Sequence, residues 1–129
     1  LGDIAFEGNK SKYFKYGRFV ENTIGDGIVS HVFDVFRPLK PLNLMFWKTL
    51  INYEPVMGKI LAKCTKSSTM MTNLDSKAFL KQGVSVPCET EQQLIADFFT
   101  SYDEAITAAK QELAKWKELK KGLLQQMFV

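Results

Sequence analysis

The sequence predicts an α+β protein, with short strands and helices over residues 1–86 and one long helix over residues 87–129. Two observations lead to this prediction. Before Pro87, runs of β-branched and aromatic residues alternate with Gly, Pro and Asp, as in short strands joined by turns. After Pro87, apolar residues recur every three or four positions, and no Gly or Pro interrupts them before Gly122. The change of pattern at Pro87 predicts the boundary between the two parts.

The first strand is expected within residues 1–8, where Ile4 and Phe6 alternate with polar neighbours. Residues 19–24 and 28–36 form two further apolar, β-branched runs. The Gly-Asp-Gly segment between them predicts a hairpin, because tight hairpin turns need positive φ angles. These two runs are therefore expected to pair with each other.

The only histidine, His31, falls in the second of these runs, and we interpret it as a structural residue. Three short helices are expected after the hairpin, at residues 42–52, 56–64 and 73–80. A hydroxyl-rich loop is expected at residues 65–69 and a last strand at residues 83–86. These elements complete the predicted mixed domain.

The positive charge of the chain is concentrated in the predicted domain. Residues 1–83 hold 12 Lys and Arg against 7 Asp and Glu, whereas residues 84–129 hold 5 against 7. The domain is therefore the part that could meet a polyanion.

Two stretches of the domain carry the side chains expected to contact DNA. In the first, lysines alternate with aromatic rings, which could hold phosphates and stack on bases. In the second, short hydroxyl side chains follow a lysine, a combination that suits phosphate oxygens. The alternative for both is an exposed loop with no ligand. The candidate residues are Lys10, Lys12, Lys15, Lys66, Ser67, Ser68 and Thr69.

The sequence offers no set of residues that would support catalysis. It has one histidine, no cluster with metal-ligand spacing and no Gly-rich cofactor loop. We therefore expect no catalytic residues, no metal and no cofactor. Cys64 and Cys88 lie far apart, and no apolar stretch has the length of a bilayer, so the sequence favours a reduced, cytoplasmic protein without membrane contact.

The long helix carries a stripe of apolar residues that predicts a partner helix. The stripe follows alternating steps of four and three residues, with one position lost at Lys120. An average of 3.5 residues keeps such a stripe facing a partner along a left-handed coiled coil. The alternative is the inner face of an ordinary globular helix. The residues expected in the helix interface are Phe99, Tyr102, Ile106, Leu113, Trp116 and Leu123.

Two segments at the ends of this helix resemble one protein family. The segment Val86-Pro87-Cys88-Glu89-Thr90-Glu91-Gln92-Gln93-Leu94-Ile95-Ala96-Asp97-Phe98 resembles the start of the C-terminal helix in specificity subunits of type I restriction–modification enzymes. The ending Leu119-Lys120-Lys121-Gly122-Leu123-Leu124-Gln125-Gln126-Met127-Phe128 is similar to the tail of the same family. Upstream, Gly2-Asp3-Ile4, residues 27–38 and residues 67–74 follow the order of a target recognition domain.

The resemblance implies a non-catalytic subunit that reads double-stranded DNA for a larger enzyme. Residues 1–86 would then be a partial target recognition domain, and residues 87–129 the long spacer helix. In the family, two such helices pack antiparallel and help to dock the methyltransferase (modification) subunits, and the restriction subunit joins that assembly. The expected partners follow from this arrangement.

The chain departs from the family pattern in two respects. It holds one recognition domain and one helix, and a Gly-Asp-Ile stretch lies inside the domain in the family, so residues 1–83 resemble the second half of such a domain. The segment Thr69-Met70-Met71 lacks the basic residue that the family often has there. We expect a homodimer with antiparallel helices, parallel pairing being the other possibility. The alternative function is a coiled-coil dimerisation and assembly module that no longer binds DNA because its recognition domain is truncated.

Overall fold

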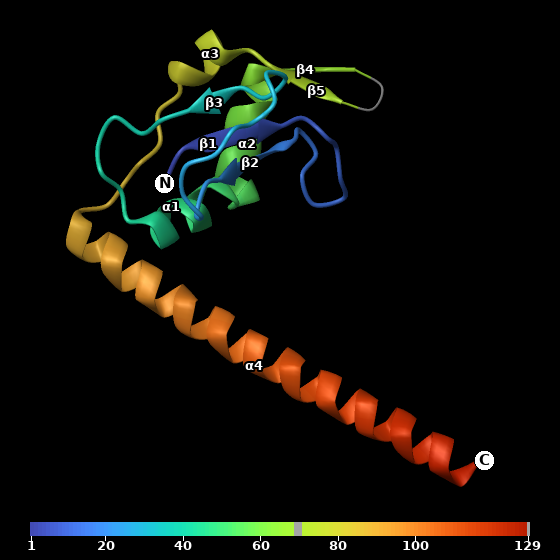
Figure 1. Ribbon diagram of the computed structural model, residues 1–129. Coiled ribbons are helices and arrows are strands. Elements are labelled where there is room, and N and C mark those ends of the chain that lie inside the picture. The colour runs from blue at the N-terminus through green and yellow to red at the C-terminus, as the bar shows by residue number, and fades with distance from the viewer. Residues whose placement is uncertain (69–70, 129) are drawn as a thin grey trace. The chain divides into compact units, whose positions relative to one another are not determined.

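The computed structural model describes residues 1–68 and 71–128, and the chain divides into two compact units, Leu1–Ala96 and Asp97–Val129. Short strands and helices occupy the first unit, and one long helix runs from its end through the second (Figure 1). The predicted α+β class is therefore confirmed.

A three-stranded antiparallel sheet forms the centre of the first unit. Strand β1 (Ile4–Glu7) lies between β2 (Arg18–Glu21) and β3 (Val35–Phe36). Strand residues alternate between the two faces of a sheet, so Ile4 and Phe6 are both buried while Ala5 is only partly covered. The register places Phe6 opposite Phe19 and Ile4 opposite Glu21.

The predicted hairpin between residues 19–24 and 28–36 is wrong. Strands β2 and β3 each pair with β1 and not with each other. The side chain of Asn22 explains the early end of β2, because its Oδ1 accepts hydrogen bonds from the backbone N–H groups of Ile24 and Gly25. This side-chain turn competes with strand pairing. Residues 28–34 contain no strand, and His31 lies in a turn instead.

The three predicted short helices are present with shifted ends. Helix α1 (Leu44–Ile51) begins after Asn43, whose side chain accepts hydrogen bonds from two backbone N–H groups of the first turn. Helix α2 (Glu54–Cys64) begins two residues earlier than expected, with a proline in its first turn. Helix α3 (Ser76–Leu80) is shorter than expected, because residues 73 and 74 belong to a strand.

A two-stranded hairpin replaces most of the loop predicted at residues 65–69. Strand β4 (Thr65–Ser67) pairs antiparallel with β5 (Thr72–Leu74). Three-residue strands are too short for an alternating pattern to identify them in a sequence. The strand expected at residues 83–86 is wrong, because these residues have no regular structure.

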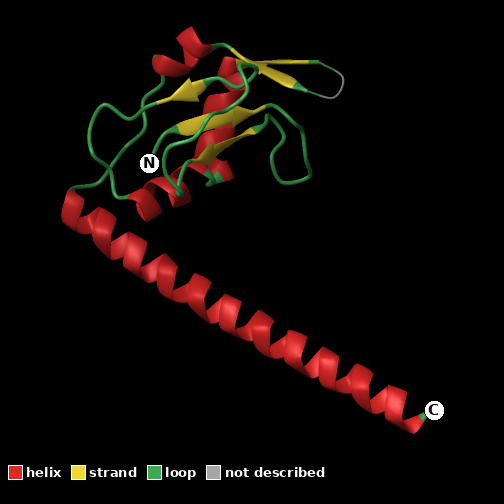
Figure 2. Cartoon of the chain, in the orientation of Figure 1, coloured by secondary structure: helices red, strands yellow, loops and turns green. Residues whose placement is uncertain are grey.

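The core of the first unit lies between the three-stranded sheet and the short helices (Figure 2). Phe19, Ile51 and Leu61 are each at most 2% exposed. The Phe19 ring lies 4.8 Å from the ring of Phe79 and 5.5 Å from that of Phe6, between centroids. Aromatic pairs at these distances add to the stabilisation from burial alone.

Helix α4 (Glu89–Met127) confirms the predicted long helix. At 1.5 Å per residue its 39 residues span about 58 Å. Its first turns belong to the first unit, where the side-chain oxygen of Gln92 accepts a hydrogen bond from the backbone N–H of Asn43 at 3.1 Å. From Asp97 to Phe128, every residue is exposed except Thr100 and Gly122, which are half-buried. Among the described residues, no helix combines the length and hydropathy needed to cross a bilayer.

Candidate nucleic-acid interface

Two segments far apart in the sequence, the loop between β1 and β2 and the β4–β5 hairpin, lie together on one side of the first unit (Figure 1). The Lys10 Nζ donates a hydrogen bond to the carbonyl oxygen of Ser68 at 2.7 Å. Asn9 and Met71 form an antiparallel bridge between the segments. The two stretches of predicted DNA-contacting residues are therefore neighbours. We call Lys10, Lys12, Lys15 and Lys66 the lysine surface.

A buried threonine fixes both ends of the β1–β2 loop. The Thr72 hydroxyl donates to the carbonyl oxygens of Gly8 and Tyr16, at 3.1 and 3.0 Å. Gly8 must lack a side chain, because a Cβ there would lie 2.2 Å from the carbonyl oxygen of Thr72. Gly17 has a φ of +84°, and a Cβ there would lie 2.6 Å from the carbonyl oxygen of Glu7. The loop thus leaves and rejoins the sheet at one anchored point.

The lysines of the loop are held beside aromatic rings. The Lys12 Nζ lies 5.8 Å from the centroid of Tyr13, and the Lys15 Nζ lies 5.7 Å from that of Tyr16. These cation–π contacts orient the ammonium groups without neutralising them. Among the described residues, neither lysine forms an ion pair with a carboxylate, so both charges remain available to an anion.

The hairpin contributes Lys66, Ser67 and Ser68 to the same region. Lys66 is exposed and lies opposite Asn73 in the ladder. Ser67 is exposed and lies opposite Thr72. The Ser68 hydroxyl donates to the carbonyl oxygen of Met71 at 2.7 Å, so it closes the turn of the hairpin. The seventh candidate, Thr69, lies outside the described residues.

Arg18, which is not among the residues predicted from the sequence, follows the loop that carries the lysines. Arg18 begins β2 directly opposite Glu7 at the end of β1. Its Nε donates to Glu7 Oε2 at 2.8 Å, and its guanidinium carbon lies 5.6 Å from the centroid of Phe14. The hydrogen bond from Arg18 lowers the pKa of the Glu7 carboxyl below its ordinary value. The Glu7 side chain therefore stays charged at neutral pH.

These residues border a small cavity of about 270 Å³. Its lining combines the Glu7–Arg18 pair with the amide of Asn9 and the rings of the loop. Arginine, asparagine and carboxylate side chains are the groups that proteins use to read base edges. The pairing register that brings Glu7 to Arg18 could not be read from the sequence, which explains why the site was missed.

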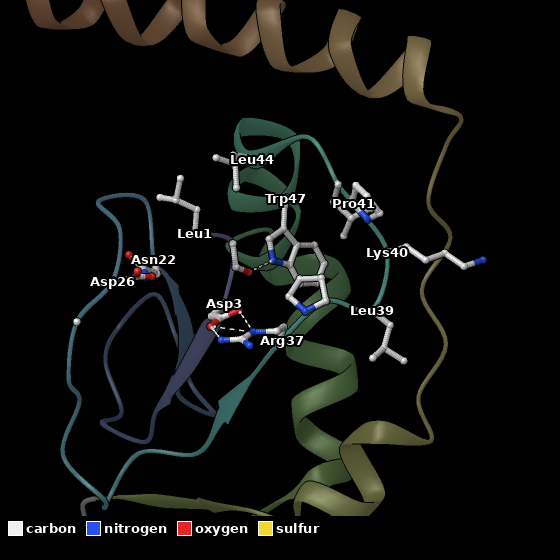
Figure 3. A pocket seen from close by; sticks show the side chains of 14 residues that line it. Leu1, Asp3, Asn22, Asp26, Arg37, Leu39, Lys40, Pro41, Leu44 and Trp47 are labelled. Carbon is white, nitrogen blue, oxygen red and sulfur yellow. Dashed lines mark hydrogen bonds and ion pairs between the residues drawn. The ribbon is translucent and has the colours of Figure 1, made fainter.

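A larger cavity, of about 790 Å³, is lined mainly by the first three residues of the chain and by residues from Arg37 to Trp47 (Figure 3). Its central cation, Arg37, donates from Nε to Asp3 Oδ1 at 3.0 Å and from Nη2 to Asp3 Oδ2 at 2.9 Å. The Trp47 indole N–H donates to the carbonyl oxygen of Gly2 at 3.2 Å. Because the Arg37 guanidinium is already paired with Asp3 through Nε and Nη2, this cavity is less suited to an anion than the lysine surface.

The apolar stripe of α4 is uncovered. Each of the six predicted interface residues is between 45% and 62% exposed. Near the end of the helix, Trp116, Leu123 and Met127 border a shallow groove of about 260 Å³. Leu119 and Leu124, which the strict 3.5-residue pattern did not include, widen the apolar surface on either side of it.

The family model described as the type I restriction modification DNA specificity domain matches residues 21–117, well over half of the chain. No curated protein and no solved structure matches the chain.

Proposed function

Because the chain belongs to the type I restriction modification DNA specificity family, we propose that it is a non-catalytic DNA sequence-recognition subunit of a type I restriction–modification enzyme. Residues 1–86 contact double-stranded DNA, and residues 87–129 form the helix that scaffolds the assembly. The observation that carries this proposal is the lysine surface, where two distant segments place positive charge on one side of the first unit.

The geometry of the lysine surface suits a duplex backbone. Lys12, Lys15 and Lys66 are exposed and have no carboxylate partner among the described residues. Exposed lysines bind phosphates through charge and release condensed counterions, which gives affinity without sequence preference. The anchored ends of the loop limit the entropy lost when DNA is bound.

The second part of the proposal concerns the partners of the helix. A 39-residue helix with an uncovered apolar stripe supports pairing with a second helix. We propose a homodimer with antiparallel helices, which presents two recognition domains about a twofold axis. The methyltransferase subunits dock on this scaffold, and the restriction subunit joins through the assembly.

A second candidate function is an assembly module that dimerises through α4 and does not bind DNA. The length of the exposed apolar stripe on α4 favours this function, because the pairing of two helices requires no nucleic acid. The two functions differ in one measurable property, the binding of duplex DNA and its dependence on salt.

The test is fluorescence anisotropy of a random-sequence duplex with the full chain, titrated at several salt concentrations. Replacing Lys12, Lys15 and Lys66 by Ala removes three phosphate contacts. The slope of log K against log[salt] should then become shallower by about 2.7, at ~0.9 per contact.

A matched triple variant on α4, with Ala at Lys115, Lys117 and Lys121, changes the net charge equally and should leave the slope as it is. An equal decrease of the salt-dependence slope in both triple variants would show that net charge alone attracts the duplex. A dimeric wild type without salt-dependent binding would establish the assembly module instead.

A further inference from the structure

We propose that Arg18 is a specificity-determining residue that reads a guanine through the major groove, held in place by Glu7 and Phe14. This inference rests on the proposed function, since it assigns a base contact within the same DNA-binding surface. It adds a residue that reads sequence to a set of lysines that hold the backbone.

One nitrogen of the Arg18 guanidinium is already used in a hydrogen bond. Glu7 Oε2 accepts from Nε, at 2.8 Å, on the inner edge of the guanidinium. Within the described part of the chain, neither Nη1 nor Nη2 of Arg18 forms a hydrogen bond. The two terminal nitrogens, Nη1 and Nη2, therefore present two parallel N–H donors, the arrangement that matches O6 and N7 of guanine.

The contacts of Arg18 with Glu7 and Phe14 together fix the plane of its guanidinium. The carboxylate lies on one edge and the Phe14 ring lies 5.6 Å from the guanidinium carbon. The side chain of Arg18 remains 43% exposed, so the fixed group is still accessible. A pre-oriented arginine loses less side-chain entropy on binding than a free one.

The neighbourhood of Arg18 suits a base contact. Arg18 follows Gly17 at the anchored end of the loop, and the loop carries Lys12 and Lys15 with their charges unpaired. The cavity of about 270 Å³ beside Arg18 also contains the amide of Asn9. Direct readout combines side chains that hold phosphates with side chains that read base edges, and this loop and the cavity beside it supply both kinds.

Arg37 provides a comparison within the same molecule. It also pairs with a carboxylate, but its Nη2 donates to Asp3 at 2.9 Å as well as its Nε at 3.0 Å. Asp3 thus binds Arg37 through two donors along the Nε–Nη2 edge, whereas Glu7 takes only the Nε donor of Arg18. Within the described part of the chain, both Nη groups of Arg18 are free of hydrogen bonds, and Arg37 keeps only Nη1 free.

The experiment is selection of binding sites from a pool of random-sequence duplexes by the full chain, followed by affinity measurements on the selected site. The wild type should select a site that contains a guanine at one position. Arg18→Lys keeps the charge but cannot form the bidentate contact, so discrimination at that guanine should fall about ten- to a hundredfold. The salt dependence of binding should stay unchanged.

Glu7→Gln should weaken the same preference while retaining the arginine, because the guanidinium loses its charged anchor. Arg37→Lys serves as the matched control and should leave the selected site unaltered. Circular dichroism and thermal melting of each variant identify any loss of fold. If Arg18→Lys selects the wild-type site with the same discrimination, the inference is wrong while the proposed function stands. If the wild type binds no duplex, both fail.

Discussion

Introducing a charge at Leu113 tests whether the stripe of α4 is an interface. In the structure Leu113 is 53% exposed, which leaves on the order of 90 Å² of apolar surface to be covered by a partner. At ~25 cal/mol per Å² this is worth about 2 kcal/mol in each copy, and about 4 kcal/mol in a symmetric dimer. Leu113→Asp removes this stabilisation and places a carboxylate in the interface, so the dissociation constant should rise about a thousandfold or more.

The assay is sedimentation velocity over a range of concentrations, with wild type and variant compared under identical conditions. Gln111→Asp introduces the same charge two residues away, outside the 3.5-residue stripe, and should leave the dimer intact. An unchanged dissociation constant for Leu113→Asp would refute the coiled-coil assignment. An equal effect of Gln111→Asp would show that negative charge, and not the stripe, controls association.

Two predictions concern stability. Glu21 is buried, and within the described part of the chain neither of its carboxylate oxygens has a hydrogen-bond partner. Burial raises its pKa above the ordinary 4.5, so wild type should lose stability as the pH rises from the ordinary value to the raised one. Glu21→Gln should therefore match wild type near pH 4 and exceed it by about 1 kcal/mol at pH 7 in urea unfolding, and a less stable variant at pH 7 would contradict the desolvation argument. Gly17→Ala should lower the free energy of unfolding by about 2 kcal/mol, because of the positive φ and the nearby Glu7 carbonyl. Gly27→Ala, which has open space around it, should change thermal stability little, and similar melting temperatures for the two variants would argue against the strain at Gly17.

The helices could be predicted because their signals are local. The spacing of apolar residues and the prolines at 41 and 87 placed all four, within a few residues of their ends. The largest misplacement, at the start of α3, has a cause elsewhere in the chain: residues 73 and 74 join a strand because β4 lies beside them. A helix contains its own hydrogen-bond partners, whereas a strand must find one elsewhere in the chain.

The sheet could not be predicted, because the partner of each strand lies elsewhere in the chain. Residues 19–24 and 28–36 have strand-like composition and a turn-like link, yet only their outer ends, in β2 and β3, form strands, and both strands pair with β1. The hydrogen bonds of the Asn22 side chain, which end β2, are a local feature that composition does not reveal. Ile24 and Ile28, expected in strands, are almost fully exposed.

The candidate site also contains residues that could be predicted from local sequence and one that could not. Six of the seven predicted DNA-contacting residues lie in two segments that the structure places side by side, and the lysines among them could be selected from charge and aromatic neighbours alone. Arg18 could not, because its role depends on the register that sets it opposite Glu7. Whether these residues contact DNA stays a prediction.

The anchoring of the β1–β2 loop has a consequence for how this protein could change its target. The carbonyl groups of Gly8 and Tyr16 accept from the same Thr72 hydroxyl, so the chain departs and returns at a single buried atom. We expect that the segment between them can be exchanged while the sheet, its register and its core remain as they are, because its other contacts with the hairpin, from Asn9 and Lys10, involve exposed residues. New recognition could therefore arise through substitution of one short insert, with the scaffold inherited unchanged.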